Sequence, residues 1–378
     1  MPADRRSAPL LLTPGPLTTA DATKRAMVGD WGSRDDDFIA MNARVRARLV
    51  ALAGGEGTHV CVPLQGSGTF AVEAALGTLV PRDGKALVLV NGAYGRRMAR
   101  ILEILGRRHE TMETAEDCPP DPRVLDARLA ADPAIGHVAV VHCETTSGIL
   151  NPLPAIAAVV ARRQRQLIVD AMSTFGGIPI DAQAVRFAAL VASSNKCLEG
   201  VPGLAFAIVR RDVLAASAGN AHSLALDLND QWRAMEGNGQ WRFTPPTQVL
   251  AALDKALTLL HEEGGVEARR LRYAANCRVL VEGLRAAGFE TLLADHLQAP
   301  VIVTFRIPAD PAFHFERFYN GLRERGFVIY PGKLTAEPSF RIGCIGAVRP
   351  ADMEAAVAAV RAVMAGLGVA SGAPPRRR

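Results

Sequence analysis

Short apolar runs alternate with longer helical patterns between about residue 60 and residue 215. The strand-like runs are HVCVPLQG, ALVLVNGAY, HVAVVHCETT, LIVDAMSTF, FAALVASSN and GLAFAIVR, and the helical patterns between the first four are SGTFAVEAALGTLV, GRRMARILEIL and LPAIAAVVARRQR. Apolar strands separated by helices are typical of a mostly parallel sheet that helices cover on both faces. We therefore predict an α/β fold in which ligands bind at the carboxyl ends of the strands.

The remaining third of the chain has a different order of predicted helices and strands. A long helical pattern ends at the glycine pair Gly264–Gly265, and a helix over 266–287 follows. The next segments are GFETLL, PVIVTFRI, HFERFYNGLRERG, FVIYPG, SFRIGCIG and DMEAAVAAVRAVMAGLG. Their order, strand-strand-helix-strand-strand-helix, predicts a small α+β domain.

The two patterns predict the domain organisation. We expect a large domain over residues 11–265, whose N-terminal arm reaches the small domain or an interface, and a small domain over 266–368. Disordered ends are expected at 1–10 and 369–378.

Composition narrows the class of protein. The chain has 378 residues, of which 49% are hydrophobic and 21% charged, with a net charge of +5. Its basic residues are scattered among acids and only 5% are aromatic, which argues against a nucleic-acid partner. Six separated cysteines without a C-x-x-C pair favour reduced thiols and the cytoplasm. The histidine spacing supports no metal site, and no apolar run is long enough to span a membrane.

The stretch QGSGTF, residues 65–70, follows a strand and opens a helix. Backbone amides at a helix N-terminus bind anions, and small residues let a phosphate approach closely. A nicotinamide or flavin dinucleotide would need an acidic residue about 20 positions later, at the end of the next strand. That strand ends in VNGAY with Asn91 instead, so the stretch favours a single phosphate monoester or a tight turn without ligand.

Two charged residues stand at the ends of apolar strands. Asp170 ends LIVD, where a carboxylate needs compensation: either it caps loop amides or it pairs with a buried cation. Lys196 follows FAALVASSN; it either faces solvent or has a lowered pKa and forms imines.

Together these features match what pyridoxal 5'-phosphate needs. The cofactor requires a phosphate anchor, a carboxylate that keeps its pyridinium protonated and a lysine that forms a Schiff base. Tyr94, at the end of the next strand after the phosphate anchor, either stacks on the ring or belongs to ordinary strand-end packing.

At larger scale the chain resembles the 2-aminoethylphosphonate–pyruvate aminotransferases, which belong to the class V, fold type I pyridoxal phosphate enzymes. The resemblance runs from about residue 10 to 365 and rests on LLTPGPLTTADATKRAM, LQGSGTFAVEAAL, NGAYGRR, HCETTSGILNPL, DAMSTFGGIPID, SSNKCLEGVPG, WRFTPPTQV and FVIYPGKLT with FRIGCIG. It implies a mostly parallel seven-stranded sheet sandwiched by helices, a homodimer with its active site at the subunit interface, and 2-aminoethylphosphonate and pyruvate as substrates.

The resemblance also implies residue roles. Lys196 carries the imine and moves the proton, while Asp170 pairs with the pyridine nitrogen. The implied cofactor-binding residues are Ser67, Gly68, Thr69, Tyr94, Thr145, Asp170, Asn195, Lys196, and Thr244 and Thr247 reaching the partner subunit's cofactor. Phe243 stands where related enzymes often have a tyrosine, so it cannot donate that hydrogen bond.

Arg341 in SFRIGC is the residue implied to bind the substrate's anionic group, since a guanidinium binds carboxylate or phosphonate through two parallel hydrogen bonds. Lys333 would add charge nearby. Two alternatives stay open: a class V aminotransferase for another donor, such as serine, alanine or a hydroxylated aminophosphonate, and a nicotinamide-dependent oxidoreductase.

Overall fold

The computed structural model describes residues 8–332 and 335–375. Its largest element is a seven-stranded sheet in the order β2-β10-β9-β8-β5-β3-β4, in which β10 runs opposite to the other six strands. The strands are β2 (His59–Gln65), β3 (Lys85–Val90), β4 (Arg108–Glu113), β5 (Ile135–Val141), β8 (Gln166–Asp170), β9 (Ala189–Ser193) and β10 (Leu204–Arg210). This mostly parallel sheet, with helices between its strands, is the α/β architecture that the sequence predicts.

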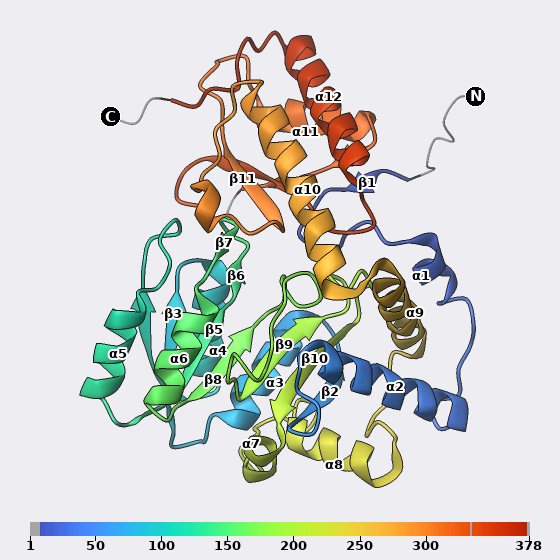
Figure 1. Ribbon diagram of the computed structural model, residues 1–378, viewed down its shortest axis with the longest axis vertical. Helices are drawn as coiled ribbons and strands as arrows, with labels where there is room; N and C mark the ends of the chain where they lie inside the picture. Colours follow the sequence, from blue (N-terminus) through green and yellow to red (C-terminus); the bar gives the residue numbers. More distant parts are fainter. Residues whose placement is uncertain (1–7, 333–334, 376–378) are drawn as a thin grey trace.

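Helices cover both faces of this sheet (Figure 1). Alternate strand residues point to opposite sides, so Leu87 and Leu89 enter one core and Val88 and Val90 the other. On the first face lie α2 (Asp36–Leu52), α5 (Pro122–Ala131), α6 (Leu153–Arg162) and α9 (Thr247–Glu263). On the second lie α3 (Gly68–Leu79), α4 (Ala93–Ile104), α7 (Arg211–Ala216) and α8 (Leu228–Asn238).

The smaller part of the molecule is built on β11 (Ile302–Arg306), β14 (Ser339–Gly343) and β13 (Tyr330–Pro331), which pair antiparallel. Helices α10 (Gly265–Arg285), α11 (Phe315–Glu324) and α12 (Pro350–Leu367) pack on it, and α10 runs down toward the large sheet (Figure 1). Its core is aromatic, with Phe340 packed against Phe289, Phe305 and Phe318.

The chain's N-terminal arm joins this smaller part. The short strand β1 (Leu10–Leu11) pairs parallel with β12 (Phe327–Val328), so residues far apart in sequence share one edge. Helix α1 (Asp21–Arg25) and the 3-10 helix Asp295–Leu297 complete the elements, together with the hairpin β6 (Cys143–Glu144) and β7 (Ile149–Leu150). In the part of the chain that the structure describes, no helix is long and apolar enough to cross a membrane.

Several expectations need correction or restriction. GFETLL is not a strand; only Thr291 forms an isolated bridge, with Phe305. FVIYPG divides into β12 and β13, which belong to different sheets. Residues 369–375 were expected to be disordered, yet the Gly372 amide donates to the Ala287 carbonyl. Residues 1–7 and 376–378 lie outside the described part.

Candidate active site

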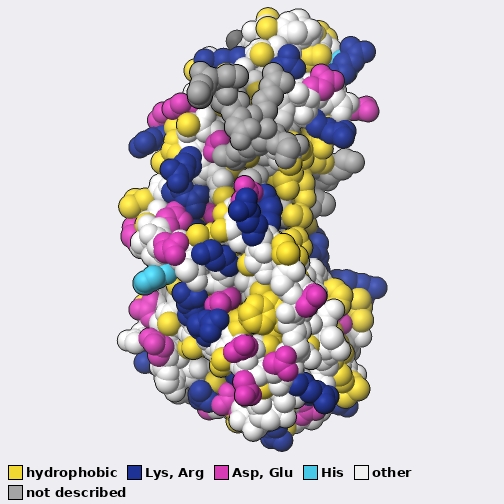
Figure 2. All heavy atoms as spheres, turned by 90° about the vertical axis from the view of Figure 1, so that its right-hand side faces the viewer, with side chains coloured by type: hydrophobic (Ala, Val, Ile, Leu, Met, Phe, Trp, Pro, Cys, Tyr) yellow, Lys and Arg dark blue, Asp and Glu magenta, His cyan; other side chains and the backbone are white. Residues whose placement is uncertain are grey.

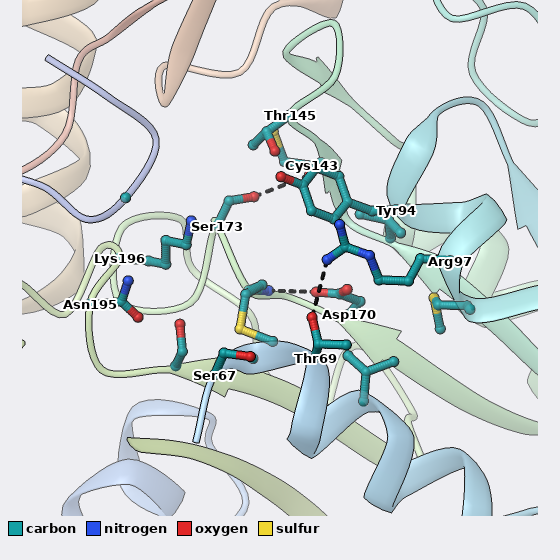
Figure 3. A pocket seen from close by; sticks show the side chains of 17 residues that line it. Ser67, Thr69, Tyr94, Arg97, Cys143, Thr145, Asp170, Ser173, Asn195 and Lys196 are labelled. Carbon is teal, nitrogen blue, oxygen red and sulfur yellow. Dashed lines mark hydrogen bonds between the residues drawn. The ribbon is translucent and has the colours of Figure 1, made fainter. Parts of the chain in front are cut away.

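The carboxyl ends of the large sheet's parallel strands border a cavity of about 230 Å³, which Figure 3 shows from close by. Its lining comes from six segments that are dispersed over the sequence. The residues are Gly15, Ser67, Gly68, Thr69, Val72, Tyr94, Arg97, Met98, Val141, Cys143, Thr145, Asp170, Met172, Ser173, Ser193, Asn195 and Lys196. The structure therefore brings eight of the predicted site residues together: Ser67, Gly68, Thr69, Tyr94, Thr145, Asp170, Asn195 and Lys196.

Lys196 stands three residues after β9, and its amine points into the cavity (Figure 3). The Nζ donates a hydrogen bond to the Pro14 carbonyl at 2.8 Å. Burial lowers the pKa of this lysine to about 8, and the guanidinium groups of Arg341 and Arg97 act in the same direction. About a tenth of the amine is therefore unprotonated at pH 7, far more than for an ordinary lysine, and the unprotonated form is the one that attacks a carbonyl.

Asp170 ends β8 on the floor of the cavity and is only 6% exposed. Its carboxylate accepts a hydrogen bond from the Met172 amide at 2.9 Å. Burial raises the pKa of Asp170 to about 6, and the nearby carboxylate of Glu144 raises it further, whereas Lys196 and Arg97 oppose the shift. A cationic ring nitrogen placed beside Asp170 would be a positively charged partner and would stabilise the ionised carboxylate.

The N-terminus of α3 forms a third wall. Ser67 is the residue before the helix, and its hydroxyl makes no capping bond. The first-turn amides of a helix have no partner within the helix and carry a partial positive charge, so Ser67, Gly68 and Thr69 offer donors to an anion. A Cβ on Gly68 would come within 2.3 Å of the Met172 sulfur, so a side chain there would displace the side chain of Met172 in the cavity wall.

The cavity's polar groups test whether a phosphate-bearing carbonyl compound fits. The Ser193 hydroxyl is buried in the wall without a hydrogen-bond partner among the described residues. Amides and hydroxyls at α3 suit a phosphate, Asp170 suits a ring cation and Lys196 suits a carbonyl. The donor set therefore fits such a group.

Arg97 was missed by the sequence reasoning. It lies on α4, one turn after Tyr94, with its guanidinium 4.8 Å from the centre of the Tyr94 ring. One Nη donates to the Thr69 hydroxyl at 3.1 Å, and no carboxylate in the described part of the chain pairs with Arg97. The three-residue spacing in YGRR was the available signal, since it places both side chains on one helix face.

The N-terminal arm also reaches the cavity, where Gly15 is part of the lining. Gly15 has φ +123°, and a side chain there would meet the Lys196 Cδ at 2.6 Å. Only glycine lets the arm lie this close to the lysine in that left-handed backbone region.

Arg341 does not line the cavity but lies at its border. It is 6% exposed on β14, and an Nη donates at 2.8 Å to the carbonyl of Thr145, a cavity residue. Further bonds run to the Pro331 carbonyl, and no carboxylate within residues 8–332 and 335–375 forms an ion pair with Arg341. Lys333 lies outside the described residues.

Thr244 and Thr247 lie away from the cavity within the single chain. Thr244 belongs to a separate, more apolar hollow with Gln65, Phe70 and Phe243. Phe70 and Phe243 are each 50% exposed. The face of the molecule that Figure 2 shows carries apolar side chains among charges of both signs. The predicted contact of these threonines with a partner's cofactor stays a prediction.

Solved structures that share this fold define its class. The chain superposes on a pyridoxamine–pyruvate aminotransferase from Mesorhizobium loti with a TM-score of 0.88 and 26% identity, covering 98% of this chain and 96% of the other. A ureidoglycine–glyoxylate aminotransferase from Bacillus subtilis gives 0.86 with 24% identity, covering 97% and 96%. The fold is that of the fold type I aminotransferases.

Sequence comparison narrows the class to a family. The family described as aminotransferase class-V matches residues 36–362. Proteins named 2-aminoethylphosphonate–pyruvate transaminase are 60% identical over 353 residues in Pseudomonas aeruginosa, covering 93% of this chain and 95% of that protein, and 57% identical over 358 residues in Pseudomonas entomophila, covering 95% and 97%. The chain belongs to the class-V aminotransferase family, and this membership does not favour the nicotinamide-dependent alternative.

Proposed function

We propose that this enzyme uses pyridoxal phosphate to transfer the amino group of 2-aminoethylphosphonate to pyruvate, forming phosphonoacetaldehyde and L-alanine. One observation carries the proposal: Lys196, Asp170 and the start of α3 share one cavity. The choice of substrates is supported by 60% identity over 353 residues with a protein named for this reaction.

The residues that would hold the cofactor are those that the family resemblance implies and that line the cavity. Ser67, Gly68 and Thr69 would bind the phosphate, with Asn195 beside them, and Tyr94 would stack on the ring. Asp170 would pair with the ring nitrogen and Thr145 would bond the phenolic oxygen. When bound, pyridoxal phosphate supplies a carbonyl that accepts the amino group and a ring that withdraws electrons.

Lys196 would serve as nucleophile and proton carrier. A pKa of about 8 lets its amine both hold and release a proton at physiological pH. The hydrogen bond to the Pro14 carbonyl orients the Nζ of Lys196. The lysine side chain lies so close to Gly15 that a side chain at that position would clash with it.

Both substrates carry an anionic group near the atoms that react. Among the described residues in or beside the cavity, two arginines, Arg97 and Arg341, have no carboxylate partner. Arg341 would bind the phosphonate or carboxylate through its planar guanidinium. A phosphonate carries more negative charge than a carboxylate. The positive charge of Arg97 would therefore strengthen binding of the amino donor more than binding of pyruvate.

The enzyme would act as a cytoplasmic homodimer. Thr244 and Thr247 would then reach the cofactor phosphate of the partner subunit, and the exposed Phe70 and Phe243 beside Thr244 would lie close to the interface. Light scattering at several protein concentrations measures the assembly, and a stable monomer would contradict this part of the proposal.

A donor panel tests the reaction. Purified protein with pyridoxal phosphate and pyruvate is offered 2-aminoethylphosphonate, a hydroxylated aminophosphonate or serine, and a parallel series offers alanine with glyoxylate. We expect alanine and phosphonoacetaldehyde to form in equal amounts with 2-aminoethylphosphonate, and much slower turnover elsewhere. Alanine formed only with serine would assign the enzyme to the rival donor.

A further inference from the structure

A cluster of buried and half-buried charged side chains contacts the Lys196 loop without lining the cavity. It contains two carboxylates, Glu199 and Glu263, two guanidinium groups, Arg269 and Arg272, and the phenol of Tyr273. Arg269 and Tyr273 are each only 1% exposed, and Arg269 is among the largest fully buried side chains of the described chain. Two positive and two negative groups make the cluster neutral.

The cluster holds the lysine loop directly. Arg269 Nη1 donates to the Cys197 carbonyl at 2.9 Å, one residue after the catalytic lysine. Glu199, three residues after Lys196, accepts from Arg272 at 2.7 Å and from the Tyr273 hydroxyl at 2.6 Å. Glu199 has φ +59°, an unfavourable value for a residue with a side chain, so these bonds hold the loop in a shape it would not prefer alone.

The same side chains hold the segment that follows the Arg341 strand. Arg272 Nη1 donates to the Gly346 carbonyl at 2.6 Å and to that of Val348 at 2.9 Å. The Gly346 amide donates to the Tyr273 hydroxyl at 3.3 Å. Tyr273 therefore links Glu199 to Gly346 through one oxygen atom.

Glu263 completes the arrangement at the joint between α9 and α10. It accepts from Arg269 at 2.7 Å and from Arg272 at 2.7 Å, just before the glycine pair Gly264–Gly265, where φ is +107° and +80°. Glycines in this backbone region impose few limits on the helix direction. The two arginines thus fix α10 relative to α9 where the backbone does not.

Buried ion pairs are an inefficient route to stability, because the loss of hydration offsets much of their attraction, and their best-supported benefit is a defined geometry. The geometry at stake here is the placement of Lys196 relative to Arg341. Resting on the proposed function, we propose that Glu199, Arg269, Arg272 and Tyr273, anchored by Glu263, are positioning residues that set the lysine loop against the strand carrying the anion-binding arginine.

Two variants test the proposal. Tyr273→Phe removes only the oxygen that links Glu199 and Gly346, and Glu199→Gln removes the loop's charge while it keeps an acceptor. Matched controls are Tyr319→Phe, on a ring that packs against Phe315, and Glu267→Gln, which breaks an exposed ion pair with Arg270 on the same helix. The conservative tyrosine variant keeps the test available if the glutamate variant fails to fold.

The first readout is amide hydrogen exchange in the full chain, with and without pyridoxal phosphate. We expect exchange in residues 194–200 and 344–348 to rise together, by about tenfold, in both test variants and in neither control. A rise confined to α10, or one spread evenly over the molecule, would show a merely structural cluster and overturn the proposal.

The second readout is the rate at which pyridoxal phosphate becomes covalently attached to Lys196, trapped by borohydride reduction and measured by mass spectrometry. We expect it to fall about tenfold or more in both test variants, because small misplacements of reacting groups cost large factors in rate. An unchanged rate with looser segments would also overturn the proposal. If the wild type itself does not attach the cofactor, the proposed function fails, while hydrogen exchange still decides the cluster's role.

Discussion

Two groups of cavity residues solve different problems: Lys196 with Asp170, named the buried end, and Ser67, Gly68 and Thr69, named the α3 end. At one end Lys196 and Asp170 are largely buried, and burial shifts the pKa of each toward its neutral form. At the other end Ser67, Gly68 and Thr69 present ordinary amides and hydroxyls at the start of α3, with Arg97 exposed beside them. Burial favours the neutral forms of Lys196 and Asp170 and so changes their reactivity. The α3 end would instead bind an anion through amides and hydroxyls that need no such shift.

This difference indicates which residues would determine the reactivity of the enzyme and which would determine its affinity for the cofactor. A substitution at the buried end should remove reactivity and can leave the fold intact or even more stable. A substitution at the α3 end should weaken cofactor binding and leave the intrinsic reactivity of the lysine unchanged.

The largest effect is expected from Lys196→Ala. Because this variant lacks the amine that we propose reacts with the carbonyl and carries the proton, we expect no covalent attachment of pyridoxal phosphate and no measurable alanine formation. Visible absorbance during addition of 2-aminoethylphosphonate, together with mass spectrometry, checks both. Lys24→Ala, which removes an exposed lysine of α1, is the control and should behave as wild type. A spectral reaction unchanged in Lys196→Ala would falsify the assignment of the lysine.

Asp170→Asn should have the next largest effect. The amide keeps the acceptor for the Met172 amide but removes the charge that would pair with the ring nitrogen, so we expect turnover to fall by about 100-fold or more. Steady-state kinetics with saturating cofactor measure this. Asp181→Asn is a matched control, since Asp181 accepts from the Gln183 amide at 2.9 Å in the same local geometry. Equal losses in both variants would show that the carboxylate acts only on the fold.

At the other end, Thr69→Val should weaken binding of pyridoxal phosphate by about 10- to 100-fold, the range for a lost hydrogen bond to a charged group. Equilibrium titration of the cofactor measures the change. Pyridoxal, which has no phosphate, provides the control because its affinity should stay almost constant. A similar loss for both compounds would place Thr69 away from the phosphate.

The smallest effect concerns stability and its pH dependence. Because the folded-state pKa of Asp170 is raised from 3.8 to about 6, the folded protein binds more protons than the unfolded chain between these values, and stability falls as the pH rises through them. Asp170→Asn lacks this loss, so it should stabilise the cofactor-free protein above pH 6 by up to about 3 kcal/mol and have little effect below 3.8. Lys196 acts in a higher window: its pKa is lowered from 10.5 to about 8, so stability should rise with pH between these values.

Thermal unfolding across this pH range measures both trends. A destabilised Asp170→Asn at neutral pH would show that the two ends do not differ as described.

Much of the molecule was readable in the sequence. The alternation of apolar runs and helices predicted the large sheet, because buried parallel strands must be apolar along their whole length. The meeting of Asp170, Lys196 and the QGSGTF turn followed from the rule that the carboxyl ends of parallel strands lie at one edge. Strand β4 escaped prediction because its sequence, RHETME, is that of a half-exposed edge strand.

Other features exist only through tertiary contact. Nothing local to Gly15 reveals that it lies against a lysine 181 positions later, and nothing local to Arg269 reveals that it holds the backbone of Cys197. GFETLL has the pattern of a strand, yet apart from one bridge it finds no ladder in the small sheet. The alternation of apolar runs and helices, and the position of polar residues at strand ends, depend on neighbours along the chain. The sequence alone therefore determined the large sheet and the edge at which the candidate site lies. Side-chain partners across the fold depend on how the elements pack, and only the tertiary structure decided those.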